Sequence, residues 1–131
     1  MLTVNYLAVV VAAVAAFVVS FVWYIVFGEQ LSSPRGMGAA AMTTPPAWMM
    51  VIELGRSLVV ASVVAGLATR LGIADWMGAA LLGLTAWIGF PAVLLAGSVL
   101  WENVPWMLAA IHAGDWLVKL LIISVIVSVW R

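Results

Sequence analysis

Four long runs of apolar residues dominate the pattern of hydrophobic and polar positions along the chain. They cover residues 4–27, 47–70, 76–100 and 106–130. Each run is long enough to cross a bilayer as a helix, which takes about 20 predominantly apolar residues. Polar and apolar positions do not alternate along the runs, as they would in the strands of a membrane barrel. We therefore predict an all-α fold with four transmembrane helices.

The connections between the runs predict how the helices are ordered. Residues 71–75 and 101–105 are short turns, and short turns join antiparallel neighbours. The first connection, residues 28–46, is longer and rich in Gly, Pro and Ser, a composition typical of loops. We expect a single domain over residues 1–131, an up-down-up-down four-helix bundle with both termini on the same side of the membrane.

Pro91 interrupts the third run. A proline inside a helix cannot donate a hydrogen bond to the carbonyl group four residues earlier, which here belongs to Trp87. We therefore predict that the third helix is kinked at Pro91. Such a kink has either a purely structural role or a role in a gate or a ligand site.

The composition agrees with a membrane protein: 67% of the residues are hydrophobic, 8% are charged, and the mean hydropathy is +1.27. The formal net charge is zero, so no basic surface is available to bind nucleic acid. The absence of cysteine excludes disulfides, thiolate metal sites, iron–sulfur clusters and covalently attached haem. The sequence shows no nucleophile–base pair and no phosphate-binding loop, so we expect neither an enzyme nor a bound cofactor.

The arginines near the ends of the runs predict the orientation in the membrane. The side that holds both termini carries Arg70 and Arg131, and the opposite side carries Arg35. Cytoplasmic segments hold an excess of positive residues, so we predict that both termini are cytoplasmic. No Lys or Arg precedes the first run, which is also longer than the apolar core of a signal peptide. We therefore do not expect the first run to be cleaved.

Small residues repeat every four positions on the first two runs. This spacing lets helix backbones approach closely in lipid. The partner helix belongs either to the same chain or to a second copy. The first stripe consists of Ala8, Ala12, Ala16 and Ser20, and the second of Ser57, Ala61, Ala65 and Thr69.

Most of the tryptophans mark the ends of the runs, as in the aromatic belt of membrane proteins. Trp87 and Trp116 differ, because both fall near the middle of a run. Together with Pro91 they either pack within the bundle or form the wall of a pocket for a cation or a flat cofactor. The tryptophans at predicted helix ends are Trp48, Trp76, Trp101, Trp106 and Trp130.

Three ionisable residues share one face of the fourth run. His112 and Asp115 are three positions apart, and Asp115 and Lys119 are four apart. Glu53 and Arg56 lie at a similar depth in the second run, so the charges in this layer sum to zero. We predict contacts between Arg56 and Asp115, between Glu53 and His112, and, within the fourth helix, between Asp115 and Lys119.

Ionisable residues at membrane depth are expensive to bury and mark a functional site by default. The five residues form either a polar network that fixes helix register or a site that carries protons or binds a small charged solute. A histidine beside carboxylates is a common arrangement in proton relays. A metal site of Glu53, His112 and Asp115 is a third hypothesis, but the two neighbouring cations would compete for the carboxylates. We therefore expect no metal.

Several short motifs recur in a known group of proteins. They are Asn5-Tyr6-Leu7-Ala8, Trp23-Tyr24 and Phe27-Gly28, joined by Trp87-Ile88-Gly89-Phe90 and Trp101-Glu102. With these motifs the chain resembles a family of small four-span bacterial membrane proteins, domain-of-unknown-function family 1761. The sequence departs from the family pattern just after residue 24, with Ile25-Val26 and Gln30-Leu31 in place of a longer spacing and a further Trp. The resemblance implies an integral four-helix protein of a bacterial inner membrane and supplies no activity.

Two functions from different classes follow from these observations. The first is an oligomeric transporter or channel whose charged cluster binds protons or a small solute, because four helices alone leave little room for a pathway and its walls. The second is a non-catalytic accessory subunit, which packs onto a larger membrane protein through its small-residue stripes and tryptophans. In both cases the partners are the lipid bilayer and either a second copy or another membrane protein.

Overall fold

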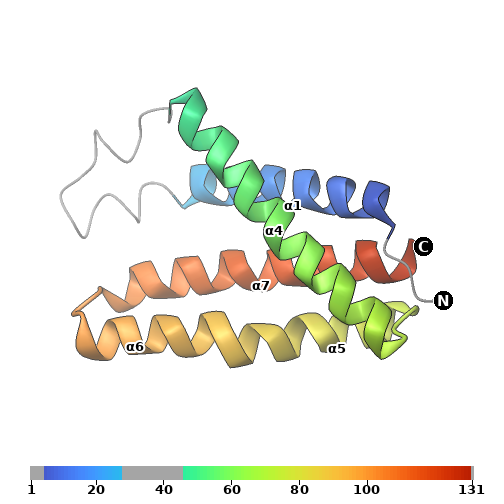
Figure 1. Ribbon diagram of the computed structural model, residues 1–131. Coiled ribbons are helices and arrows are strands. Elements are labelled where there is room, and N and C mark those ends of the chain that lie inside the picture. The colour runs from blue at the N-terminus through green and yellow to red at the C-terminus, as the bar shows by residue number, and fades with distance from the viewer. Residues whose placement is uncertain (1–4, 28–45, 131) are drawn as a thin grey trace.

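The computed structural model describes residues 5–27 and 46–130, and the regular secondary structure of this part of the chain is helical throughout (Figure 1). The predicted all-α class is confirmed, and so are four helical segments long and apolar enough to cross a membrane. In chain order they are α1 (Tyr6–Val26), α4 (Ala47–Leu71), a third segment made of α5 (Trp76–Trp87), η2 (Ile88–Ala92) and α6 (Val93–Trp101), and α7 (Trp106–Val129).

Polar residues and glycine set the ends of the helices. The side chain of Asn5 accepts hydrogen bonds from two backbone N–H groups in the first turn of α1, and Asp75 does the same for one N–H group of α5. Helix α4 ends at Gly72, whose φ of 71° lies in the left-handed region that glycine adopts without steric cost. The short turn predicted between the second and third spans is therefore bounded by strong local signals, Gly72 and Asp75.

Several predictions concern residues outside the described part of the chain. The expected start of the first span at Val4 is one of them. Two of the three arginines used to orient the protein, Arg35 and Arg131, are others. The cytoplasmic location of the termini therefore stays a prediction.

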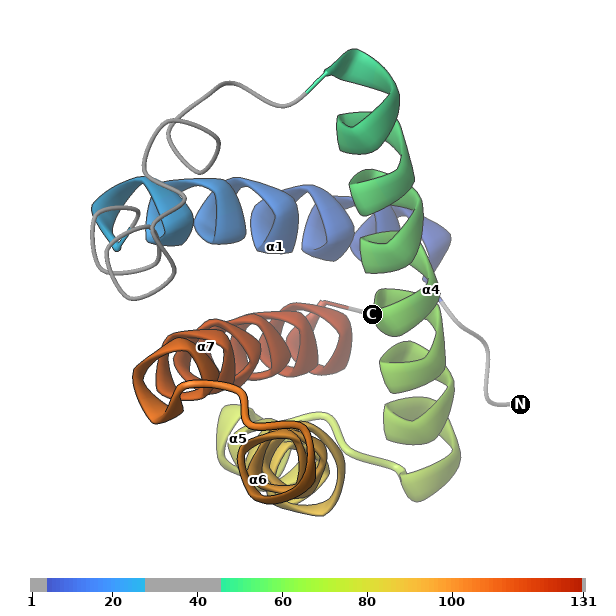
Figure 2. The same cartoon turned by 90° about the vertical axis from the view of Figure 1, so that its left-hand side faces the viewer.

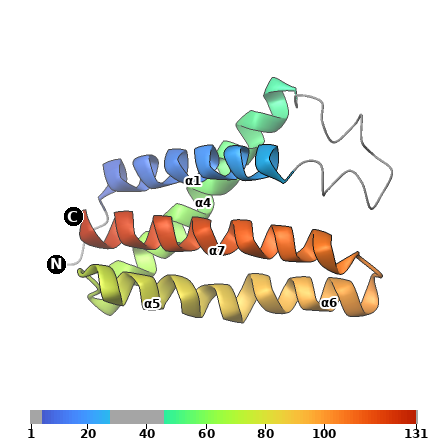
Figure 3. The same ribbon diagram turned by 180° about the vertical axis from the view of Figure 1, so that it is seen from behind.

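Helix α7 is the centre of the molecule. It contacts α1, α4, α5, η2 and α6. Helix α1, by comparison, packs mainly against two helices, α4 and α7. Figures 1 and 3 show α1, α7 and the α5–α6 segment lying side by side, with α7 in the middle and with successive helices running in alternating directions. Figure 2 shows that α4 lies obliquely across one face of this layer. The ionisable face of the fourth span is thereby placed in the interior.

The small-residue stripes of the first two spans are used within the chain. Ala8, Ala12 and Ala16 of α1 are fully buried, and on α4 Ala61 is fully buried and Ala65 nearly so. These helices contact each other, and most of the stripe belongs to the same apolar core as Ile123 and Val127 of α7. Close backbone approach through small side chains is what stabilises helix pairs in lipid. The partner of each stripe is thus another helix of the same copy.

The third span has a local irregularity at Pro91. Residues Ile88–Ala92 form a π-helical turn, which shifts backbone hydrogen bonding around the missing N–H group of the proline. On either side of it, α5 and α6 continue along α7 (Figure 1). A π-helical turn therefore accompanies the proline, and the predicted kink of the helix axis stays a prediction.

Helices α5 and α7 approach each other closely at Gly83. A Cβ atom built there would lie 3.0 Å from the carbonyl oxygen of Leu120 and 3.1 Å from Ser124 Oγ. Gly83→Ala is therefore expected to push the two helices apart and to lower the free energy of unfolding by about 1–3 kcal/mol. Unfolding in mixed detergent micelles measures this change.

Gly97→Ala is the matched control, in the same span. Nothing lies within 4 Å of a Cβ atom at Gly97, so this change should leave stability unchanged or raise it slightly through helix propensity. Equal losses for both variants would contradict the close contact of α5 with α7.

Candidate functional site

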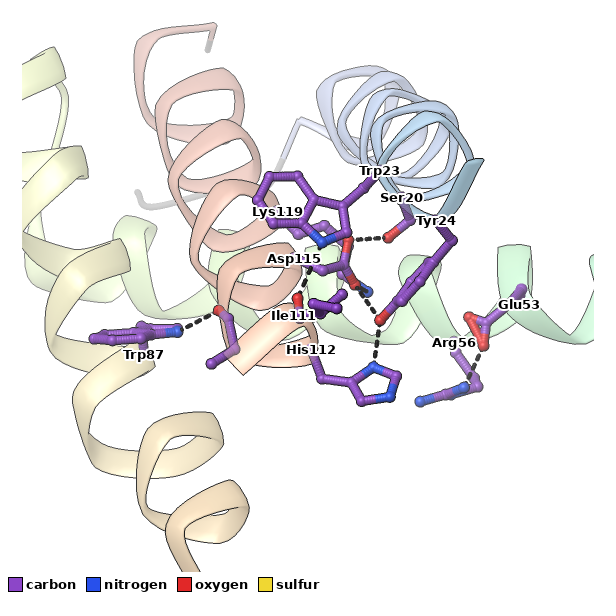
Figure 4. Close-up of polar contacts among 11 residues, drawn as sticks. Ser20, Trp23, Tyr24, Glu53, Arg56, Trp87, Ile111, His112, Asp115 and Lys119 are labelled. Carbon is purple, nitrogen blue, oxygen red and sulfur yellow. Dashed lines mark hydrogen bonds and ion pairs between the residues drawn. The ribbon is translucent and has the colours of Figure 1, made fainter. Parts of the chain in front are cut away.

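Asp115 is the centre of the polar cluster. Its relative exposure is 1%, although it is a carboxylate on a membrane-length helix. The Nζ atom of Lys119, one turn later on α7, lies 3.2 Å from its Oδ2 atom (Figure 4). The predicted contact between these two residues is therefore present. The side chain of Asp115 is 2% exposed and that of Lys119 is 11% exposed, so each charge compensates the other in a largely buried environment.

Helix α1 supplies two hydroxyl groups to the same carboxylate. Ser20 Oγ donates to Asp115 Oδ1 at 2.5 Å, and Tyr24 Oη donates to Asp115 Oδ2 at 3.3 Å. The two donors are four residues apart, so they lie on one face of α1. The sequence pattern predicts only a packing role for Ser20, and Tyr24 stands out only as part of a family motif. A pair of hydroxyls at helical spacing in an otherwise apolar run is the signal that could have identified them.

Tyr24 also connects Asp115 to His112. The Tyr24 Oη and His112 Nδ1 atoms lie 2.5 Å apart, and the two rings are tilted by 53°. A carboxylate only accepts hydrogen bonds, so when the Tyr24 hydroxyl donates to Asp115, its oxygen accepts from His112 in the form that carries a proton on Nδ1. The three residues form one directed chain of hydrogen bonds, which sequence analysis did not predict.

Two tryptophans hold the polar turn of α7 in place. Trp23 Nε1 donates to the carbonyl oxygen of Ile111 at 3.0 Å, and Trp87 Nε1 donates to that of Ala113 at 2.8 Å. The Trp23 ring lies flush against Gly114, where an added Cβ atom would be 2.6 Å from it. The indole side chains from α1 and α5 thus both form hydrogen bonds with the turn of α7 that leads to Asp115. Trp87 therefore positions the backbone of α7 and does not line the pocket described below.

Glu53 and Arg56 form a separate ion pair on α4. The Arg56 guanidinium contacts the Glu53 carboxylate three residues earlier, and their side chains are 63% and 46% exposed, respectively. The predicted ion pair between Arg56 and Asp115 is therefore wrong: each residue has its partner on its own helix. The physical reason is the spacing within each helix. Side chains three or four residues apart meet on one helix face, so these pairs form without any alignment of α4 with α7.

A small pocket lies between the two ion pairs. Its volume is about 40 Å³, and its polar lining comes from Glu53, Arg56 and Ser57 on α4 and from Trp116 and Lys119 on α7. The Nζ atom of Lys119 lies 4.0 Å from the centroid of the Trp116 ring, a cation–π distance. The structure thus places Trp116 at the wall of a pocket, and brings Glu53 and Arg56 beside Lys119 rather than beside Asp115. Pro91 lies on the third span, outside this lining.

The donor set of the cluster does not suit a metal ion. Among residues 5–27 and 46–130, no three His, Asp or Glu side chains lie close enough together to bind one. The carboxylate of Asp115 already accepts from a lysine and two hydroxyls. The arrangement can instead bind and transfer a proton, because a histidine, a phenol and a carboxylate are joined in sequence.

Comparison with known proteins gives a family and no activity. The family described as "Protein of unknown function (DUF1761)" matches residues 7–128, and the chain belongs to this family, as its N-terminal motifs predicted. No curated protein and no solved structure matches the chain. The function must therefore be argued from the residues of the site.

Removal of one partner from the buried ion pair is expected to be costly. Lys119→Met should lower the free energy of unfolding by about 3 kcal/mol, because Asp115 keeps no counter-charge. Asp115→Asn should also cost about 3 kcal/mol, because it leaves the Lys119 ammonium without a counter-charge and turns the amide NH2 group towards one of the two hydroxyl donors. The double variant should be more stable than Lys119→Met alone. Unfolding in mixed detergent micelles gives all three values.

The control is Arg70→Met, which removes an exposed cation from the last turn of α4. Its effect should stay within about 0.5 kcal/mol, as for other surface changes. Strictly additive losses in the double variant would show that Asp115 and Lys119 do not interact.

Proposed function

We propose that this member of the DUF1761 family is a transporter- or channel-like protein of a bacterial inner membrane, and that it works as an oligomer. Its substrate site is the cluster around Asp115, which binds a proton or a small solute. It catalyses no covalent reaction and needs no cofactor. The multi-pass helical architecture supports the membrane location, and the buried cluster supports the transport role.

The directed chain from His112 to Asp115 is the observation that carries this proposal. His112 is half-buried, whereas Asp115 is fully buried, so the chain leads from an accessible group to an inaccessible one. In the state in which His112 carries a proton on both ring nitrogens, one proton moves from His112 Nδ1 to Tyr24 Oη while the hydroxyl proton of Tyr24 moves to Asp115 Oδ2. Tyr24 is unchanged by this relay, the imidazolium of His112 becomes a neutral imidazole, and Asp115 becomes neutral. A network that served only to fix helix register would not need the histidine at its outer end.

The position of Glu53 and Arg56 supports self-association. They lie about 9 and 14 Å along α4 from Ala47, at a depth where acyl chains solvate charge poorly. Their side chains are nevertheless about half exposed in a single copy. A second copy related by a two-fold axis would bring each Arg56 towards the Glu53 of the other, because such an interface uses the same patch twice. Dimerisation would thus cover a charged pair that lipid cannot accommodate.

The accessory-subunit hypothesis has less support. The small-residue stripes that it needs for docking are buried between α1 and α4 of one copy. A larger partner could still contact the outer face of α5 and α6, where α6 has no buried residue, or the exposed apolar side chains of α1 and α4. Apolar side chains exposed on that face suit lipid equally well.

Tyr24→Phe is expected to reduce proton flux into proteoliposomes by about 100-fold, because it removes the group that relays the proton. Asp115→Asn should abolish the flux. The measurement is the acidification of a trapped pH-sensitive dye after an external pH jump, with the membrane potential clamped by potassium and valinomycin.

Tyr6→Phe is the matched control, the same exchange on the same helix at a residue that is 79% exposed. It should retain the wild-type flux. Wild-type vesicles no more permeable to protons than protein-free ones would overturn the proposal. Isolation from the host in a stoichiometric complex with unrelated chains would favour the accessory role instead.

A further inference from the structure

The pocket beside Lys119 has an excess of hydrogen-bond donors. Arg56 and Lys119 both line it, and each has more N–H groups than its single carboxylate contact uses. Ser57 adds a hydroxyl group to the lining. The carboxylate in the lining, that of Glu53, already accepts from Arg56. The pocket therefore offers donors and positive charge to an occupant.

The charges around the pocket depend on the protonation of Asp115. With Asp115 ionised, the four residues Glu53, Arg56, Asp115 and Lys119 are neutral together. When the relay from His112 protonates Asp115, Lys119 loses its counter-charge and the group has a net charge of +1. A largely buried lysine side chain requires a new partner for its ammonium group in that state. The pocket that it lines is where such a partner can bind.

We propose that this pocket binds a small monovalent anion, such as chloride or nitrate, when Asp115 is protonated, and that proton and anion cross together. This inference rests on the proposed transport function and names its second substrate. The volume of about 40 Å³ has room for about three water molecules, or for one small ion with part of its hydration shell. Larger organic anions do not fit. Cations are disfavoured by Arg56 and Lys119, and a divalent anion would leave the group with a net negative charge.

Proton binding and anion binding are coupled because Lys119 both contacts Asp115 and lines the pocket. Anion binding to Lys119 and Arg56 stabilises the protonated form of Asp115, and protonation of Asp115 strengthens anion binding by the same free energy. Either ion alone leaves an uncompensated charge at membrane depth, whereas both together leave none. Transport of the pair is electroneutral, so its rate should not depend on the membrane potential.

The test uses the full-length protein in liposomes of neutral lipid. Internal acidification is followed after an external pH drop in chloride, in nitrate and in gluconate, with and without a potassium–valinomycin clamp. Acidification should be fast in chloride and nitrate, slow in gluconate, and insensitive to the clamp. Arg56→Gln should raise the half-saturating chloride concentration by about tenfold or more, the equivalent of one charge-assisted hydrogen bond. Arg70→Gln, which removes an exposed cation at the end of the same helix, should leave it unchanged.

The outcomes separate this inference from the proposed function. Acidification at equal rates in all three anions would overturn the anion site and leave proton transport standing. Anion dependence that survives unchanged in Arg56→Gln would place the anion elsewhere and also overturn the inference. Absence of acidification by wild-type protein in every anion would overturn both proposals.

Discussion

The central constraint on this protein is the burial of the Asp115 carboxylate in a helix that spans the membrane. A charge at that depth is tolerated only when hydrogen bonds and a counter-charge surround it. Lys119 supplies the charge from the next turn of α7, and Ser20 and Tyr24 supply hydroxyl groups from α1. The position of α1 against α7 is thus fixed by polar chemistry as well as by packing. Displacement of α1 would leave a buried carboxylate with fewer donors.

The rest of the bundle lets these groups meet. Small side chains along α1 and α4 allow the backbones to come close, and Gly83 does the same between α5 and α7. The indoles of Trp23 and Trp87 donate to the backbone carbonyls of Ile111 and Ala113, in the turn just before Gly114. Since α7 has neighbours on several sides, its polar face is enclosed by three other spans. This enclosure gives the cluster its low local dielectric, in which hydrogen bonds and ion pairs are strong.

The two ion pairs of the cluster occupy contrasting environments. The pair of Asp115 and Lys119 is buried, whereas the pair of Glu53 and Arg56 is about half exposed on α4. The sequence pattern predicts that these four charged residues lie in one layer, which is sufficient to identify the polar region. It could not assign the partners, because a shared depth leaves open which helix faces turn towards each other. Each cation in fact pairs with the carboxylate one turn earlier on its own helix, an arrangement that needs no tertiary contact.

The sequence by itself determined the helical class, the four spans, the short turns and the ionisable face of the fourth span. These features follow from run length, hydropathy and spacing, which act within one helix. Only the tertiary structure decided that α7 is central, that the small-residue stripes pack within one copy, and that Ser20 and Tyr24 complete the Asp115 site. The contacts of Ser20 and Tyr24 with Asp115 join residues more than 90 positions apart. They depend on how the helices are rotated and tilted against each other, which periodicity along a single helix does not specify.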